Sequence, residues 1–258
     1  MTCIGLVLGG SRGLGFSAAR AIASLGCNVC IVARGLEGLV RAASEITSMF
    51  PVEVLYLKAD LRAEGSVRGV VERLVGGWGR VDYVVSAYGN ISREPLELHE
   101  ASWSDWMEAA ALYVASTGEL FRALVELNPS KATVVLLSSF SVAEPMSPLV
   151  VSDAMRAALS RIVKVAARRY PDKLRPILVL LGSFPTPGAF ETLRKIAEKR
   201  GEDLGELWRR EVEGRSPLGR AGRLSEFERF LMGILRSPEY LTGVTIMFDG
   251  STSRVAWP

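Results

Sequence analysis

Short apolar runs rich in Val, Ile and Leu alternate along the chain with longer segments in which apolar residues recur every three to four positions. Such alternation, with strands apolar on both faces, is typical of a parallel sheet covered by helices on both sides. The short runs predict strands at Ile4–Leu8, Asn28–Ala33, Val52–Leu57, Val81–Ser86, Thr133–Ser138, Ile177–Leu181 and Val244–Phe248. The periodic segments predict helices near Leu14–Leu25, Leu36–Met49, Glu64–Val75, Trp103–Leu127, Ser152–Arg169 and Ser225–Leu235.

No linker, repeat or low-complexity tract interrupts this alternation over the 258 residues. We therefore predict a single α/β domain, residues 1–258, built on a doubly wound parallel sheet of about seven strands. A highly charged helical stretch, residues 188–214, lies between the last two predicted strands. Additions at the carboxyl ends of strands often cover a ligand crevice, so this stretch is a candidate substrate lid. A surface helix without a role is the alternative.

Composition restricts the class of protein. Charged residues make up 23%, hydrophobic residues 48%, and the net charge is +3. No apolar run is long enough to cross a membrane, and the apolar N-terminus lacks the basic residues of a signal peptide, so we expect a cytoplasmic protein. Basic residues are spread out and form no stripe interleaved with aromatic residues, which argues against a nucleic-acid partner.

The cysteines and the histidine predict neither a disulfide framework nor a metal site. Three cysteines are an odd number in a long chain. Cys27 and Cys30 lie three residues apart at a predicted strand, where alternation sends side chains to opposite faces, so we expect core thiols. His99, the only histidine, lies in a polar stretch without ligand partners, and we expect it at the surface.

A cluster of glycines directly follows the first predicted strand and opens the first predicted helix. Glycine lets the chain turn sharply and lets backbone N–H groups approach a pyrophosphate at the positive end of a helix. This context predicts a Rossmann-type dinucleotide site. The residues expected to contact the cofactor here are Gly9, Ser11, Arg12, Gly13, Leu14 and Gly15.

The end of the second strand indicates which dinucleotide binds. An NAD site usually carries a carboxylate about twenty residues past the glycines, to accept from the ribose 2′-hydroxyl. This chain has Arg34 there, and the side chain of Arg12 can reach the same region beside the ribose. Two guanidiniums suit the 2′-phosphate, so NADP(H) is favoured over NAD(H). The alternative is that Arg34 is solvated and Glu37 binds the ribose.

These features resemble the short-chain dehydrogenase/reductase family over nearly the whole chain. Gly9, Gly13 and Gly15 match the family's TGxxxGxG turn, with Leu8 in place of its threonine. The resemblance also covers Ser86-Ala87-Tyr88-Gly89 in place of NNAG, Leu181–Thr186 in place of PGxxxT, and the closing segment Gly243–Gly250.

The resemblance assigns further cofactor contacts. Asp60 would accept from the adenine amino group with Leu61 beside it, although Asp60 fits a helix cap equally well. Thr186 would contact the nicotinamide carboxamide. The groove beside the cofactor would be lined by Ala87, Tyr88 and Gly89. The family also implies a homo-oligomer, a dimer or commonly a tetramer, built through the two long helices.

The family's reaction uses a serine, a tyrosine and a lysine, and only the serine is retained here. Ser139 precedes Ser152 by thirteen residues, which is the family's usual spacing from serine to tyrosine. The tyrosine is therefore replaced by Ser152 and the lysine by Arg156, a pair that also occurs in a branch of the family. A serine hydroxyl is a far weaker acid than a phenol, and arginine cannot release a proton at working pH. Either the chemistry is carried differently or it is absent.

Three groups are candidates to replace the missing phenol. Tyr113 falls where the family has its active-site asparagine, and in the cleft Arg156 would favour its ionised form. Its apolar surroundings, Ala109 to Val114, are more typical of a core or interface residue. Tyr88 lies beside the cofactor groove, and a water held by Ser139 and Ser152 is the third candidate.

Two functions follow from these residues. The first is an NADP(H)-dependent oxidoreductase that interconverts a carbonyl and an alcohol on a small or medium organic substrate. In it Ser139 polarises the oxygen, Arg156 holds the ribose, and Tyr113 or a bound water handles the proton. The second is an NADP(H)-binding protein without redox turnover, acting as a sensor or a structural subunit.

Overall fold

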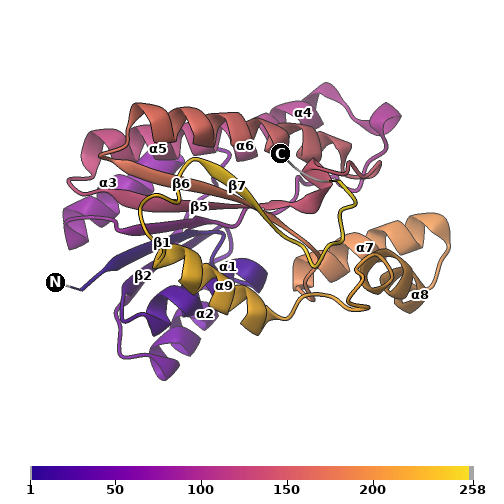
Figure 1. Ribbon diagram of the computed structural model, residues 1–258, viewed down its shortest axis with the longest axis horizontal. Helices are drawn as coiled ribbons and strands as arrows, with labels where there is room; N and C mark the ends of the chain where they lie inside the picture. The colour runs from indigo at the N-terminus through magenta and orange to yellow at the C-terminus, as the bar shows by residue number, and fades with distance from the viewer. Residues whose placement is uncertain (1, 256–258) are drawn as a thin grey trace.

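One sheet forms the centre of the protein, whose computed structural model describes residues 2–255 (Figure 1). Its seven strands are all parallel, in the order β3-β2-β1-β4-β5-β6-β7. They are β1 (Ile4–Leu8), β2 (Asn28–Ala33), β3 (Val54–Lys58), β4 (Tyr83–Ser86), β5 (Ala132–Ser139), β6 (Leu174–Leu181) and β7 (Val244–Phe248). The predicted Rossmann-type α/β fold is confirmed.

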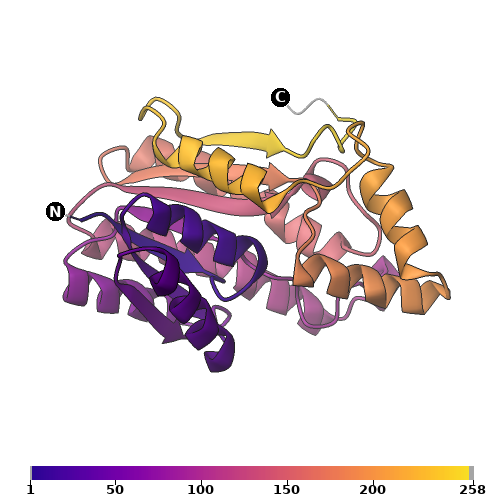
Figure 2. The same cartoon turned by 90° about the horizontal axis from the view of Figure 1, so that it is seen from below.

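Helices cover both faces of the sheet, as Figures 1 and 2 show. On one face α3 (Ser66–Trp78), α5 (Ser116–Leu127) and α6 (Val150–Arg169) bury their apolar sides. On the other face lie α1 (Gly13–Ser24), α2 (Leu36–Met49) and α9 (Leu224–Leu235). Because β1 pairs with both β2 and β4, the chain reverses its winding direction there, and the carboxyl ends of these strands open the crevice where such folds bind ligands.

The predicted helix Trp103–Leu127 is interrupted by one π-helical turn. It consists of α4 (Trp103–Ala109), a π turn over Ala110–Ala115, and α5. The turn contains Tyr113. A single π turn leaves the apolar periodicity nearly unchanged, so the pattern did not show it, and such turns are frequent at functional sites.

Other boundaries shift by a few residues. β6 begins at Leu174, ahead of the predicted Ile177. Pro176 lacks an N–H, but its carbonyl accepts from Gly243 N at 2.8 Å, so the strand continues through it. The charged stretch 188–214 is helical, as α7 (Pro187–Arg200), α8 (Leu204–Trp208) and a π turn over Arg209–Glu213. In Figure 1, α7 and α8 project beyond the sheet at the carboxyl ends of its strands.

The prediction for Cys27 is wrong. Cys3 and Cys27 form a disulfide, with 4.5 Å between their Cα atoms. Each residue directly precedes one of two paired strands, and the register that aligns Ile4 with Asn28 brings the two cysteines side by side. Cys30 is a buried free thiol, as predicted.

Three further predictions from the sequence concern the place of His99, membrane-spanning segments and metal sites. His99 is exposed in a short 3₁₀ turn, Leu98–Glu100, as predicted. Between residues 2 and 255 no helix is both long and apolar enough to cross a bilayer. No cluster of three or more potential metal-ligating side chains occurs in the same range.

Candidate active site

The glycine turn after β1 is packed so closely that only glycine fits. Gly9 has φ +86°, and a Cβ there would overlap the carbonyl oxygen of Ala87, the residue that follows β4. A Cβ on Gly15, in the first turn of α1, would overlap the carbonyl oxygen of Gly9. The backbone therefore forms a smooth concave turn at the N-terminus of α1, which fits a pyrophosphate.

Two guanidiniums lie near this turn, as the prediction of a 2′-phosphate requires. Arg34, which follows β2, is exposed. The Arg12 side chain is 62% exposed and forms an ion pair with Glu191 at 3.1 Å. Glu37 forms an exposed pair with Arg41 on the same helix at 3.2 Å, so the geometry does not favour Glu37 as the ribose ligand. The turn and its charges fit NADP(H).

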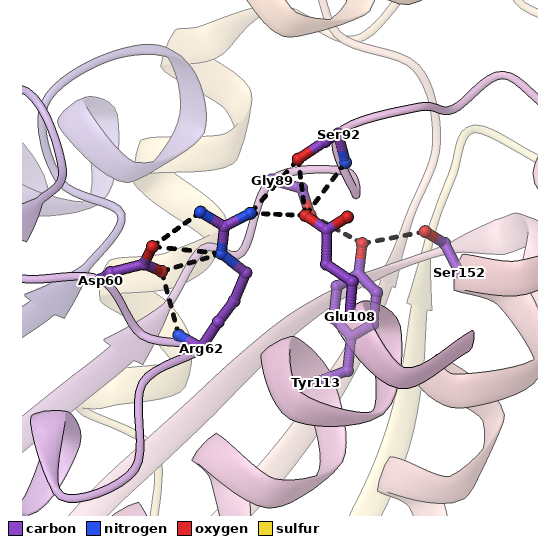
Figure 3. Close-up of polar contacts among 7 residues, drawn as sticks. All are labelled: Asp60, Arg62, Gly89, Ser92, Glu108, Tyr113 and Ser152. Carbon is purple, nitrogen blue, oxygen red and sulfur yellow. Dashed lines mark hydrogen bonds and ion pairs between the residues drawn. The ribbon is translucent and has the colours of Figure 1, made fainter. Parts of the chain in front are cut away.

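Asp60 forms an ion pair with Arg62 (Figure 3). The Arg62 Nη2 lies 2.6 Å from Asp60 Oδ2, and the Arg62 backbone N donates to Asp60 Oδ1 at 3.1 Å. Hydrogen bonding to Arg62 keeps the pKa of Asp60 below its usual range. Asp60 does not cap α3, whose N-cap is Gly65, so the helix-cap alternative is wrong for that helix. Its ionised carboxylate keeps lone pairs for an amino group.

The same arginine ties the adenine side of the crevice to the segment after β4. Its Nη1 contacts Glu108 Oε1 at 2.5 Å and Ser92 Oγ at 3.2 Å, as Figure 3 shows. Glu108 on α4 also accepts from the Ser92 hydroxyl at 2.7 Å. This chain of charged contacts holds the loop beyond Gly89 against α4.

Ser152, at the family's tyrosine position, lies in a buried polar cluster. Its backbone N donates to Glu94 Oε1 at 2.8 Å, and its hydroxyl donates to Glu94 Oε2. Its Oγ is also 3.0 Å from the Tyr113 hydroxyl (Figure 3). Glu94 and Ser152 are both buried. The predicted water shared by Ser139 and Ser152 is therefore not favoured, because Ser152 is bonded within this cluster.

Arg156 closes the cluster from the next turn of α6. Its Nη2 donates to the Tyr113 hydroxyl and to Asn90 Oδ1, both at 3.1 Å. Its guanidinium carbon lies 4.7 Å from the centre of the Tyr113 ring. Within residues 2–255, its Nε and Nη1 have no hydrogen-bond partner, so two nitrogens can bind a ribose hydroxyl.

The structure places the hydroxyls of Tyr113 and Tyr88 differently. Tyr113 has no exposed surface, and its hydroxyl donates to the Gly89 carbonyl at 2.7 Å rather than into an open cleft. Burial raises the pKa of this phenol. The positive charge of the nearby Arg156 lowers the pKa, but by less than burial raises it. The Tyr113 side chain lies in the core, where the alternative reading of its apolar surroundings placed it. The Tyr88 hydroxyl contacts Thr117 Oγ1 at 3.3 Å, on α5.

Ser139 is the half-buried last residue of β5. Its Oγ accepts from the backbone N of Ser141 at 3.2 Å and lies 2.8 Å from the Ser141 Oγ. The Ser141 Oγ in turn lies 2.5 Å from Asp153 Oδ1. Ser139 is the partly accessible end of this row of oxygens, and Ser141 and Asp153 are buried.

Helix α7 reaches toward the crevice from the other side. Thr186 caps its N-terminus by accepting from Ala189 N at 3.2 Å, and its Cβ lies beside Gly13. Thr192 accepts from Asn90 Nδ2 at 3.0 Å. Together with the pair between Arg12 and Glu191, this contact connects α7 to the glycine turn and to the loop after β4.

The chain is similar to known proteins over nearly its whole length. A family model described as enoyl-(acyl carrier protein) reductase matches residues 9–252. The chain belongs to the short-chain dehydrogenase/reductase family. This is a family of oxidoreductases, and the match spans the glycine turn, the Ser139 strand and the Ser152–Arg156 helix.

Relatives of this dehydrogenase/reductase cover almost its full length. The 3-oxoacyl-[acyl-carrier-protein] reductase of Bos taurus is 28% identical over 95% of this chain and 95% of its own. The NADP-dependent mannitol dehydrogenase of Hypocrea jecorina is 24% identical over 93% and 88%. The solved L-sorbose reductase of Gluconobacter frateurii, complexed with NADPH and L-sorbose, has a TM-score of 0.88 at 22% identity over 98% and 97%.

Four residues of the polar cluster around Ser139 and Ser152 were not predicted from the sequence. Glu94 and Asn90 lie in an irregular loop without periodicity to orient them. Ser141 follows Ser139 by two residues, and Asp153 directly follows Ser152. A carboxylate inside the reactive-residue motif was the available signal for Asp153.

Proposed function

We propose that this protein is an NADP(H)-dependent oxidoreductase that interconverts a carbonyl and an alcohol on a small or medium organic substrate. The observation that carries the proposal is the position of Ser139. Its hydroxyl is the accessible end of a hydrogen-bonded row at the carboxyl end of β5, in the same crevice edge as the glycine turn. The reductases and dehydrogenases that match nearly the whole chain support the reaction class.

Each part of the cofactor has residues suited to it. The turn Gly9–Gly15, including Ser11 and Leu14, would hold the pyrophosphate, with Arg12 and Arg34 on the 2′-phosphate. Asp60 and Leu61 would flank the adenine. The nicotinamide half would contact Ala87, Tyr88, Gly89, Arg156 and Thr186. When bound, the nicotinamide supplies or accepts the hydride.

The protein's own residues position the substrate oxygen. The Ser139 hydroxyl donates a hydrogen bond to it, which stabilises negative charge as the carbonyl is reduced. Arg156, held by Asn90 and Tyr113, binds the ribose and adds positive charge. Tyr113 positions two groups. Its hydroxyl donates to the Gly89 carbonyl and accepts from Arg156, so its proton is not directed toward the substrate. The stretch 188–214 covers the crevice as the substrate lid.

Loss of the tyrosine–lysine pair favours a second candidate, an NADP(H)-binding protein without turnover. One experiment separates the two. Purified protein is titrated with NADPH, and NADPH oxidation is then followed with a panel of ketones and aldehydes. Binding with turnover of at least one substrate supports the oxidoreductase. Tight binding without turnover on the whole panel supports the sensor or structural subunit.

The assembly and the location remain predictions. We propose a homodimer or homotetramer built through α4–α5 and α6, and a cytoplasmic location. Light scattering coupled to gel filtration measures the first directly. A monomer at micromolar concentration would contradict it.

A further inference from the structure

Three side-chain oxygens form a row from the crevice into the protein. Asp153 Oδ1 lies 2.5 Å from Ser141 Oγ, and Ser141 Oγ lies 2.8 Å from Ser139 Oγ. Asp153 is 4% exposed and Ser141 is fully buried, whereas Ser139 is half-buried. The row therefore connects the half-buried Ser139 hydroxyl, which is proposed to bind the substrate, to a carboxyl group that solvent barely reaches.

A hydroxyl carries one proton, so the direction of this row depends on the state of Asp153. If Asp153 is ionised, the Ser141 hydroxyl donates its one proton to the carboxylate and has none for Ser139. A proton that Ser139 gave to the substrate could then not be replaced along the row. If Asp153 is protonated, it donates to Ser141, and Ser141 donates to Ser139. The Ser139 proton is then free to point into the crevice.

We propose that Asp153 supplies the proton for carbonyl reduction, acting through Ser141 and Ser139, and so replaces the phenol that this chain lacks. The inference rests on the proposed function of the same site. Asp153 does not touch the substrate, and Ser139 is the catalytic residue at the end of the row.

The proton balance closes within these groups. As the substrate carbon accepts hydride from the reduced nicotinamide, its oxygen takes the Ser139 proton and becomes a hydroxyl. Ser139 takes the Ser141 proton, and Ser141 takes the proton of Asp153. One O–H bond of the Asp153 carboxyl breaks and one O–H bond of the alcohol forms. Asp153 is left as a carboxylate and regains a proton from solvent. Alcohol oxidation runs the same row in reverse.

The surroundings of Asp153 suit a carboxyl group that holds a proton. Burial raises its pKa, while the Ser141 hydrogen bond, Arg156 and the Met146 backbone N–H oppose the rise. The other ionisable groups that interact with it are Glu94 and Tyr113. Glu94 is negative when ionised and favours the protonated form of Asp153. Burial raises the pKa of Tyr113, which favours its uncharged form.

The neighbouring Glu94 is the rival source, and its contacts argue against it. Its carboxyl group contacts the backbone and hydroxyl of Ser152, and Ser152 contacts Tyr113. The Tyr113 hydroxyl then donates to the Gly89 carbonyl, which cannot pass on a proton. This second row ends on the backbone, whereas the row from Asp153 ends on Ser139.

Kinetics of Asp153→Asn and Ser141→Ala test the relay, with Asp105→Asn as a matched control. Asp105 is also a buried carboxylate, but it pairs with Arg93 and Ser102 at the start of α4. With any carbonyl substrate that the wild type reduces, kcat should fall about 100-fold in both relay variants and stay near wild type in Asp105→Asn. The wild-type decline of kcat at rising pH should disappear in Asp153→Asn, and Asp153→Glu should restore part of it.

An unchanged rate and pH profile in Asp153→Asn, with an active wild type, would overturn the relay and leave the oxidoreductase intact. A wild type that binds NADPH but reduces nothing would instead remove the proposed function.

A measurement that needs no turnover completes the test. Infrared difference spectra of ligand-free wild type minus Asp153→Asn should show a protonated carboxylic acid that titrates with pH. A carboxylate band at every pH where the protein is folded would also overturn the relay.

Discussion

Arg12 of the glycine turn and Glu191 of α7 form an ion pair, with 3.1 Å between Nη2 and Oε2. They are 179 residues apart in sequence. The same guanidinium is proposed to bind the 2′-phosphate of NADP(H). In that proposal a cofactor phosphate and the Glu191 carboxylate would compete for Arg12, which would couple cofactor binding to the position of α7.

Glu191→Gln should strengthen binding of NADP⁺, because Arg12 no longer has a competing carboxylate. The pair is exposed, so the expected gain is modest, about two- to fivefold in Kd. NAD⁺, which lacks the 2′-phosphate, should bind as before. Isothermal titration of both dinucleotides measures the difference. Glu198→Gln, which removes an exposed partner of Arg194 on the same helix, should change neither Kd.

Arg34→Ala should reduce the preference for NADP⁺ over NAD⁺. A charge-assisted hydrogen bond contributes about 1.5–3 kcal/mol. The Kd for NAD⁺ divided by the Kd for NADP⁺ should therefore fall about 10- to 100-fold. Arg41→Ala is the control, since Arg41 lies on α2 and pairs with Glu37. An unaltered ratio in Arg34→Ala would show that Arg34 is only solvated.

Gly15→Ala should abolish dinucleotide binding or prevent the turn from forming. The added Cβ would overlap the Gly9 carbonyl, and the neighbouring Ala87 side chain leaves no room for a shift. Gly69→Ala places the same methyl group in open space on α3 and should bind normally. Circular dichroism and an NADPH fluorescence titration distinguish lost binding from lost fold. Wild-type affinity in Gly15→Ala would contradict the tight turn.

Tyr113→Phe should lower the free energy of unfolding and leave the rate of proton transfer nearly unchanged. Removing the hydroxyl leaves one Arg156 N–H without a partner in a buried site and also removes the hydrogen bond to the Gly89 carbonyl. The expected loss is about 1–3 kcal/mol in the free energy of unfolding, measured by urea denaturation. The pH profile of kcat should keep its shape. A 100-fold lower kcat at unchanged stability would restore Tyr113 as the proton donor.

Glu94→Gln should flatten the dependence of stability on pH. Burial raises the pKa of Glu94 above its ordinary value of 4.5, so the folded state holds this proton more tightly than the unfolded state. The contribution to stability is then fully present below the ordinary pKa and is lost as pH rises through the folded pKa. The wild type should lose stability relative to Glu94→Gln over that range in denaturation at several pH values. A constant difference between the two proteins would rule out a raised pKa.

The sequence alone determined the fold and the cofactor turn. A parallel sheet covered on both faces follows from strands that are apolar on both faces and alternate with amphipathic helices, and each signal lies within a few residues. The glycine turn is equally local, because the positive φ of Gly9 and Gly13 and the start of α1 depend on neighbouring residues. The spacing of Ser139, Ser152 and Arg156 likewise needed only counting.

The tertiary structure decided which polar groups meet. Glu94 and Ser152 are 58 residues apart, and Cys3 and Cys27 meet only through strand register. Apolar periodicity records which face of an element is buried, but it does not record where a buried hydroxyl or carboxyl finds its partner. Tyr113 shows this, since its position suggested a phenol in the cleft and packing of α4–α5 against α6 buried it instead. Hydrogen-bond partners of buried groups are chosen by the packed arrangement of whole elements, and that arrangement turned Asp153 toward Ser141.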